Sequence, residues 1–224
     1  MLSVDLWSEI LAQGSERRFR AGSVMLRQGD TGTHLLALTK GLAKVVSRDR
    51  DGTATLLAFR GPGDMLGEVA VFDGGTRIAD VIALSPCSAV ILEAARFRAF
   101  VEQRRLVMDL MRQAMARLRE SDLLRSELLT LPLVVRLART LVRLVDLADP
   151  NSATHSASVP LSVSRAPLRL TGLTQEELAQ SIGVTRNAVG SGLRQLRASG
   201  AVETARREIM IKDLETLLLW AKGG

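Results

Sequence analysis

The spacing of hydrophobic positions changes along the chain and separates a β-rich first part from a helical second part. Between about residues 15 and 93, short apolar runs alternate with glycine-containing turns, a pattern typical of a β-sandwich or barrel. A short helix is expected before this region, at residues 5–12. The candidate strands are VMLRQ, LLALTK, LAKVVSR, TATLLAF, ADVIAL and AVILE.

A long helix is expected from Arg96 to about Leu129. This stretch contains neither proline nor glycine, and its apolar residues recur three and four positions apart. A small barrel cannot cover such a helix, so we expect it to pair in parallel with the same helix of a second copy. An antiparallel mate within the chain is the alternative. The expected stripe contains Val107, Met111, Ala114 and Leu118, flanked by Leu110, Met115 and Leu123.

Pro132 breaks the long helix, and a helical pattern resumes over residues 133–147. We expect a hinge between domains at this break. Residues 149–167 are rich in Ser, Ala and Pro, which predicts an exposed connection with a short strand at 159–163.

Residues 174–196 have the pattern of two short helices joined by a tight turn. Thr174, with Glu177 three residues later, predicts a capping box, and Thr185 is suited to cap the second helix. Gly183 permits the sharp turn between them. A second helix in this arrangement is suited to enter the major groove of DNA. Its apolar positions are Val189, Leu193 and Leu196.

A β-hairpin is expected directly after these two helices. Gly200 ends the second helix, and residues 201–211 predict the hairpin, with Arg206 and Arg207 near its tip. A hairpin in this position is a wing, and the following residues DLETLLLWA predict a closing helix.

Composition narrows the classes of function. The 224 residues carry a formal net charge of +6 and a sequence pI near 10.6, which suits a polyanionic partner. Hydrophobic residues make up 46% of the chain, enough for a packed core. Aromatic residues are only 3%, which disfavours a stacking platform for single-stranded nucleic acid.

Cysteine and histidine are too few for most metal chemistry. Cys87 is the single cysteine, which excludes an internal disulfide and a multi-cysteine zinc or iron–sulfur site. Its surroundings predict a small buried residue at the start of a strand. His34 and His155 are the only histidines, so we assign no metal site and no catalytic residue.

The chain shows no secretory signal and no apolar run long enough to span a membrane. We therefore expect a cytoplasmic protein without a membrane partner.

Taken together, these blocks resemble the cyclic-AMP receptor protein / fumarate–nitrate regulator (Crp/Fnr) family of bacterial transcription factors. The resemblance covers nearly the whole chain, in the order that the family has. It is carried by Gly22, Gly29-Asp30, Gly41, GPGDMLGE at 61–68, GGTRIADV at 74–81, RLARTLVRL at 136–144 and TQEELAQSIGVTRNAVGSGLRQL at 174–196.

The resemblance implies an α+β fold in three parts. These are a cyclic-nucleotide-binding-type β jelly roll over residues 1–95, a dimerisation helix over 96–131 and a winged helix-turn-helix over 132–224. It also implies a homodimer that controls transcription on palindromic double-stranded DNA, with RNA polymerase as a further partner. The two recognition helices would then lie about 34 Å apart, one turn of the duplex.

An effector pocket is also implied, with cyclic AMP and cyclic GMP as candidate ligands and no further cofactor. Gly67 and Glu68 match the ribose-binding end of the family's phosphate cassette, and Arg77 falls where its phosphate-binding arginine is expected. An arginine suits this task because its planar fork can pair with two phosphate oxygens. The alternative is an empty pocket in which Glu68 and Arg77 form an ion pair.

Two positions of this pocket depart from the family pattern. Ile78 stands where responsive members carry Ser or Thr, and the loss of that hydroxyl costs on the order of 1.5–3 kcal/mol of phosphate binding. Another small effector, or none, therefore remains open. On the long helix, Ser121 and Asp122 stand where such members present hydroxyls to the base, and Asp122 can accept a hydrogen bond from an amino group.

The candidate DNA-reading residues lie on the second helix of the pair and on the wing. Arg186 can reach guanine O6 and N7, Asn187 can pair with adenine, and Ser191 can contact a base edge or a phosphate. Only Arg186 keeps the residue type of well-known members at these three positions, so we expect a different operator. Phosphate contacts are expected from Thr174, Thr185, Arg194, Arg206 and Arg207.

Three other hypotheses compete with this one. A metal-dependent enzyme built on the jelly roll needs clustered histidines and carboxylates, which two distant histidines do not supply. A nucleotide-sensing module that regulates a partner protein would not need the complete helix pair and wing. A regulator that acts without an effector is the third.

Overall fold

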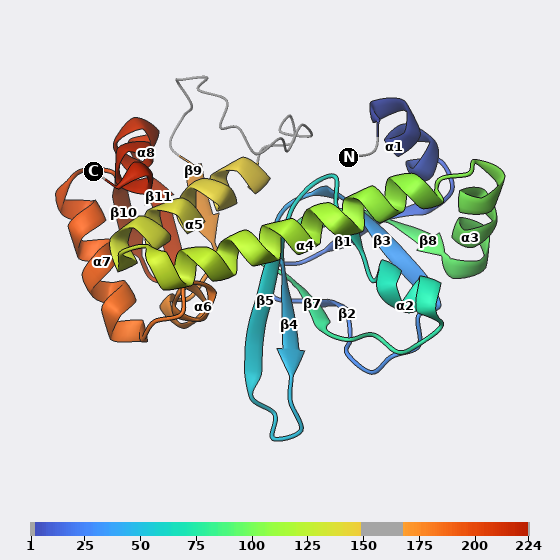
Figure 1. Ribbon diagram of the computed structural model, residues 1–224, viewed down its shortest axis with the longest axis horizontal. Helices are drawn as coiled ribbons and strands as arrows, with labels where there is room; N and C mark the ends of the chain where they lie inside the picture. Colours follow the sequence, from blue (N-terminus) through green and yellow to red (C-terminus); the bar gives the residue numbers. More distant parts are fainter. Residues whose placement is uncertain (1–2, 149–167, 224) are drawn as a thin grey trace. The chain divides into compact units, whose positions relative to one another are not determined.

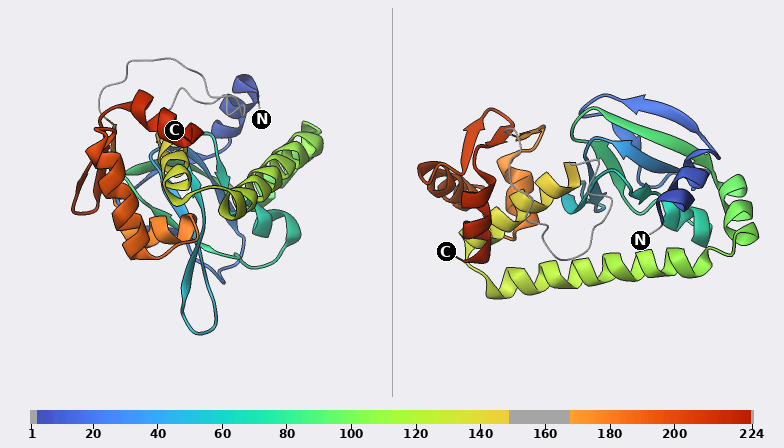
Figure 2. Two further views of the ribbon diagram at one scale, coloured as in Figure 1. Left: turned by 60° about the vertical axis from the view of Figure 1, so that its left-hand side comes forward. Right: turned by 90° about the horizontal axis from the view of Figure 1, so that it is seen from above.

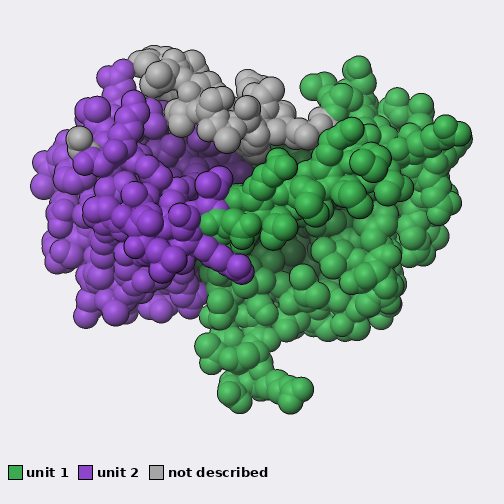
Figure 3. Space-filling view, viewed as in Figure 1, with its two compact units in different colours: residues 1–122, 150–155 green, residues 123–149, 156–224 purple. Residues whose placement is uncertain are grey.

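The computed structural model describes residues 3–148 and 168–223, and the expected strand at 159–163 lies outside them. The chain divides into two compact units, residues 1–122 with 150–155 and residues 123–149 with 156–224 (Figures 1 and 3). The domain boundaries expected at residues 95 and 131 stay a prediction. No helix in the described ranges combines the length and the apolar character that a membrane span requires.

The first unit is built around two four-stranded antiparallel sheets, with strand orders β1-β8-β3-β6 and β2-β7-β4-β5. All the strands expected from apolar runs are confirmed. Two further strands were not expected. They are β1, which buries only Phe19, and β6, which has two residues. The bounds are β1 Ser15–Phe19, β2 Val24–Leu26, β3 His34–Lys40, β4 Ala43–Arg48, β5 Ala54–Arg60, β6 Met65–Leu66, β7 Asp80–Ala83 and β8 Cys87–Glu93.

Strand β3 lies at the centre of the core, because both of its faces are buried. Leu36 and Leu38 face the cluster between the two sheets. Leu35, on the other face, packs with Ile10 of α1 (Val4–Leu11) and Phe97 of α3 (Ala94–Gln103), two helices at one end of the jelly roll (Figure 2). Successive side chains of a strand point to opposite faces, so this continuous apolar run is the signature of a strand covered on both sides.

Cys87 begins β8 and is buried, as the sequence predicts. Burial raises the pKa of its thiol to about 11, so the group stays protonated near neutral pH. The thiol donates a hydrogen bond to the carbonyl oxygen of Leu42. A protonated, buried thiol is a poor nucleophile, which disfavours a redox role.

The expectation of one continuous helix from Arg96 is wrong. The chain forms α3 and then α4 (Val107–Thr130), separated by Arg105 in the left-handed conformation with φ 55°. Leu106, next in sequence, is buried against the same core cluster as Phe97. The sequence around this break contains no glycine or proline. The burial of Leu106 in the core favours the break instead.

Most apolar side chains of α4 are exposed rather than packed on the jelly roll. Leu110 contacts the core cluster, but no residue of the helix is fully buried. The expected stripe therefore lies on the outer side of α4, where it is available to another surface. Over the whole helix, the exposed large apolar residues are Val107, Met108, Met111, Met115, Leu118, Leu123, Leu128 and Leu129.

The second unit contains a winged helix-turn-helix around α5. Leu137, Leu141 and Leu144 of α5 are fully buried, and α7 and α8 pack against this helix. A three-stranded sheet, in the order β10-β11-β9, forms the wing. The bounds are α5 Leu133–Ala148, β9 Leu168–Thr171, α6 Gln175–Ser181, α7 Arg186–Ala198, β10 Val202–Ala205, β11 Glu208–Ile211 and α8 Leu214–Lys222.

Arginines of α5 tie the last turn of α4 to the helix-turn-helix. Arg136 Nη1 donates to the carbonyl oxygen of Ile182 at 2.6 Å and to that of Leu128 at 3.3 Å. Arg139 and Arg143 both form ion pairs with Glu127 of α4. Both the end of α4 and the turn between α6 and α7 are thus bound to the same helix, α5.

Glu127→Gln should destabilise this second unit in a pH-dependent way. Burial works to raise the pKa of Glu127, but hydrogen bonds and charge from Arg143 and Arg139 outweigh it and hold the pKa below its ordinary value. The stabilisation is therefore present above the carboxyl pKa of the unfolded chain and is lost as pH falls through the lower folded value. Because the two arginines are each 35% exposed, we expect a loss of only about 1–2 kcal/mol.

Urea unfolding of the two proteins at about pH 7 and about pH 3 measures this difference. The difference in unfolding free energy should be clear at the higher pH and smaller at the lower pH. Asp109→Asn is the matched control, because Asp109 pairs with Arg112 on the exposed surface of the same helix and should contribute under about 0.5 kcal/mol. A Glu127 effect equal at both pH values would show that its charge is not the cause.

Candidate effector pocket and DNA-binding surface

Arg77 and Gly67 are in direct contact inside the jelly roll. The side chain of Arg77 is buried, and its guanidinium donates to the carbonyl oxygens of Gly67, at 3.2 Å, and of His34. Gly67 has φ 80°, and a Cβ placed on it would lie 2.2 Å from Arg77 Nη1. No side chain fits at this position while the arginine is in place.

The charge of Arg77 is buried inside the jelly roll. Burial lowers its pKa, although the nearby carboxylates of Asp30 and Glu68 act to raise it. Within the described part of the chain, Arg77 forms no ion pair. Asp80, also buried, differs: it accepts from Gln28 N at 2.8 Å and from Arg48 Nε at 3.0 Å. A buried, unpaired cation is costly, and an anionic ligand would compensate it.

Glu68 pairs with Arg117 of α4, so the alternative of a Glu68–Arg77 ion pair is wrong. Arg117 Nη2 also donates to Met65 O at 2.7 Å and to Asp64 Oδ1 at 3.2 Å. Burial works to lower the pKa of Arg117, but the two carboxylates outweigh it and raise this pKa. Arg117 therefore joins α4 to the segment that begins α2 (Glu68–Asp73). Its Nε is buried without a hydrogen-bond partner among the described residues.

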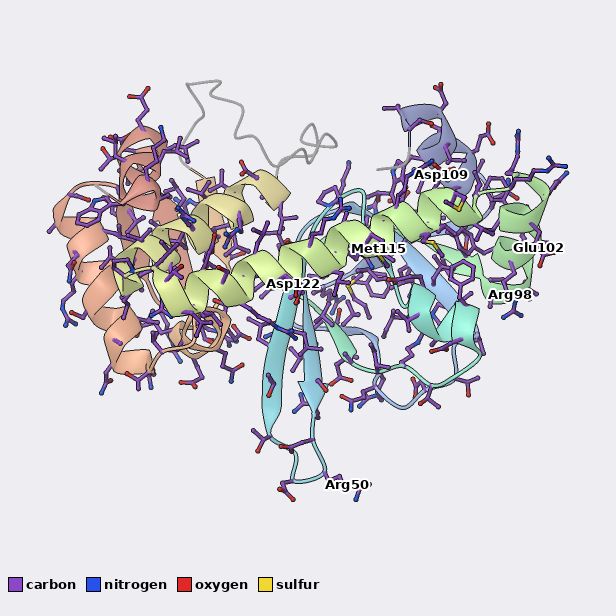
Figure 4. All side chains as sticks on the ribbon, viewed as in Figure 1. Arg50, Arg98, Glu102, Asp109, Met115 and Asp122 are labelled. Atoms are coloured by element: carbon purple, nitrogen blue, oxygen red, sulfur yellow. The ribbon has the colours of Figure 1, made fainter. Side chains whose placement is uncertain are left out.

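The remaining pocket candidates lie at different places. Ser121 follows Arg117 by one helical turn, so the two share a side of α4, and Ser121 is half-buried. Ile78, 64% exposed, directly follows Arg77. Asp122 is exposed and lies on the outer side of α4, two turns after Met115, so it is not brought to Arg77 within this chain (Figure 4).

Arg117 is the residue of this region that sequence reasoning missed. The chain has many arginines, and nothing close in sequence distinguishes this one. The available signal was its spacing, four residues before Ser121 and on the side of α4 away from the apolar stripe.

The two caps of the helix-turn-helix are confirmed. Thr174 Oγ1 accepts from Glu177 N at 3.1 Å, and Glu177 Oε2 accepts from Thr174 N at 2.8 Å, which completes the capping box. Thr185 Oγ1 accepts from Ala188 N at 3.3 Å at the start of α7. Both threonines therefore fix the helix starts, and any contact with phosphate stays a prediction.

The outer face of α7 and the tip of the wing carry exposed polar groups. Val189, Leu193 and Leu196 are buried, as the helical spacing predicts. Arg206 and Arg207 form the two-residue turn between β10 and β11. Across residues 168–223, none of the candidate arginines forms an ion pair. The exposed candidates are Arg186, Asn187, Arg194, Arg206 and Arg207, and Ser191 is half-buried.

In the ranges that the structure covers, His, Cys, Asp and Glu side chains do not gather into a group that could hold a metal ion.

Both units match known families. Residues 16–104 match the model of the cyclic nucleotide-binding domain, and residues 135–220 match the Crp-like helix-turn-helix domain. Together the two matches account for most of the chain.

Curated relatives match over most of the chain. The CRP-like cAMP-activated global transcriptional regulator of Mycobacterium tuberculosis is 27% identical over 201 residues, 89% of this chain and 84% of the relative. The cAMP-activated global transcriptional regulator Vfr of Pseudomonas aeruginosa is 26% identical over 208 residues, 91% and 92% of the two chains.

A crystal structure of a CRP-family transcriptional regulator from Thermus thermophilus is similar with a TM-score of 0.69 at 27% identity. The similarity covers 93% of this chain and 97% of the other. Family models on both units and relatives over the full length lead to one conclusion: the chain belongs to the Crp/Fnr family of DNA-binding transcription regulators.

Proposed function

We propose that this regulator binds palindromic DNA as a homodimer and is modulated by a cyclic nucleotide held in its jelly roll. The observation that carries the effector proposal is the buried guanidinium of Arg77, which forms no ion pair with any described residue and lies against Gly67. Calorimetric titration with cyclic AMP and with cyclic GMP tests it. A saturating heat with one ligand per chain supports the proposal, and no heat with either ligand contradicts it.

The nucleotide would engage both ends of this pocket. Its phosphate would supply a negatively charged partner for Arg77. Its ribose hydroxyl would compete with Arg117 for a hydrogen bond to Glu68. The buried Nε of Arg117 offers one more donor. The side chain of Ile78 offers no donor, so the phosphate is held by fewer side-chain contacts than in relatives with a hydroxyl at this position.

Release of Glu68 from Arg117 would change how α4 is held on the jelly roll. The other end of α4 is tied to the turn before the recognition helix α7 by Arg136 and to α5 by Glu127. A shift of α4 would therefore reach α7 through the contacts of Arg136 and Glu127. We propose that this route sets the spacing of the two recognition helices.

The exposed apolar stripe of α4 is the proposed dimer contact. A second copy presents the same stripe, and two-fold pairing removes both from water. Such a dimer would act in the cytoplasm, place two copies of α7 on successive turns of the duplex and contact RNA polymerase from DNA.

Arg186→Ala should weaken the free energy of binding to the best DNA sequence by about 1–3 kcal/mol. It should also reduce the discrimination between bases at one base pair of each half-site. Arg186 is the first residue of α7 and is exposed. Fluorescence anisotropy with a panel of single-base variants measures both effects. Arg206→Ala is the matched control, because a phosphate contact from the wing tip should weaken every sequence equally. Uniform weakening by Arg186→Ala would mark it as a backbone contact.

A further inference from the structure

The exposed face of α4 follows a seven-residue repeat through its whole length. Positions alternately three and four apart carry exposed side chains, which is the a/d pattern of a two-stranded coiled coil. In order, these positions are Met108, Met111, Met115, Leu118, Asp122, Arg125 and Leu129.

Two adjacent positions of this seam are charged. Asp122 occupies an a position and Arg125 the next d position, between Leu118 and Leu129. Both side chains are exposed, and neither forms an ion pair within the described ranges of this chain. Burying either group alone in an apolar seam would be costly, so each needs a partner of opposite charge in the dimer.

We propose that Asp122 of each protomer pairs with Arg125 of the other, so that two symmetric ion pairs fix the register of a parallel α4 dimer. In a parallel, in-register pair, these positions differ by three residues, a rise of about 4.5 Å, which an arginine side chain spans. The two-fold axis then gives each carboxylate one guanidinium. In an antiparallel pair in which Leu118 packs against the partner's Met115, Asp122 would instead face Met111 and Arg125 would face Met108, so both charges would lack partners.

This inference rests on the proposed homodimer, and it adds the residues that fix the register of its two α4 helices. Methionine and leucine side chains tolerate several registers, because they are apolar and adaptable. A one-heptad slip would bring Asp122 beside Leu118 and leave its charge without a partner. The charged layer therefore opposes slipped and mismatched pairings more than it strengthens the correct one.

The test uses the full chain and two charge reversals, Asp122→Arg and Arg125→Asp. Each variant carries two like charges per helix at the seam, so each should raise the dimer dissociation constant by at least about 10-fold in sedimentation equilibrium. The control Arg50→Asp changes net charge as Arg125→Asp does, but at the tip of the β4–β5 hairpin (Figure 4), and should leave dimerisation unchanged.

Mixing the two variants gives the decisive result. One variant has only arginines at these two positions and the other only aspartates, so opposite charges meet only in the heterodimer. Native mass spectrometry should therefore find a larger fraction of heterodimer than random mixing of the two chains would give. An ion pair within each helix, the competing explanation, is broken in both variants and predicts random mixing. Misfolded variants would not form a preferred heterodimer.

Random mixing, or single variants that dimerise as well as the wild type, would overturn the proposed pairing while the homodimer stands. A wild-type protein that is monomeric at every concentration would instead overturn the proposed homodimer itself.

Discussion

Arg77→Ala should abolish the response to cyclic nucleotides, with a dissociation constant raised by at least about 100-fold. Arg77 is 4% exposed and forms no ion pair in the described chain, so its charge is the main attraction that the pocket offers to a phosphate. A charge-assisted, two-pronged contact of this kind cannot be replaced by water once the side chain is truncated. Calorimetric titration of both proteins with cyclic AMP and cyclic GMP measures the loss.

The control for this experiment is Arg48→Ala. Arg48 is an arginine of the same jelly roll that pairs with Asp80, and its removal changes net charge equally. It should leave nucleotide binding within about 3-fold of the wild type. Thermal unfolding of each variant checks that the jelly roll is intact, because Arg77 also donates to the carbonyl oxygens of Gly67 and His34. An Arg77→Ala protein that titrates like the wild type would discard the pocket.

Replacing Met115 and Leu118 together with aspartate should yield a monomer that binds DNA at least about 100-fold more weakly. These residues lie at successive seam positions and are 47% and 54% exposed. Four carboxylates at one point of the dimer would be desolvated beside one another, which opposes association. A monomer can occupy only one half-site, so it loses the gain from binding two sites at once.

Leu57→Asp is the matched control, since Leu57 is 51% exposed on β5 and lies outside the seam. Sedimentation velocity gives the oligomeric state, and anisotropy on a fragment bound by the wild type gives DNA affinity. A doubly substituted protein that stays dimeric would place the dimer contact on some other surface.

The strands and helices of this chain were largely predictable, and the exceptions have physical causes. Apolar runs predicted the inner strands correctly because β3 and β8 each bury four of their seven residues. β1 escaped notice because it is an edge strand with four exposed residues. The break before α4 escaped because it depends on the burial of Leu106 in a core formed by distant segments.

The candidate site was predictable only where local sequence determines geometry. The left-handed Gly67 and the capping threonines follow from residue type and spacing. The pairing of Glu68 with Arg117 joins positions 49 residues apart, so it required the fold. Asp122 is exposed on the outer side of α4, and its expected contact with the base stays a prediction.

Selection of genomic DNA fragments by the purified protein, with and without cyclic AMP or cyclic GMP, shows whether the protein recognises a specific duplex sequence under the control of a nucleotide. We expect enrichment of fragments that share a two-fold symmetric sequence, with half-sites about 34 Å apart and two chains bound per site. We also expect that one of the nucleotides changes this enrichment. Failure of the protein to enrich any duplex sequence under all three conditions would contradict the proposed function.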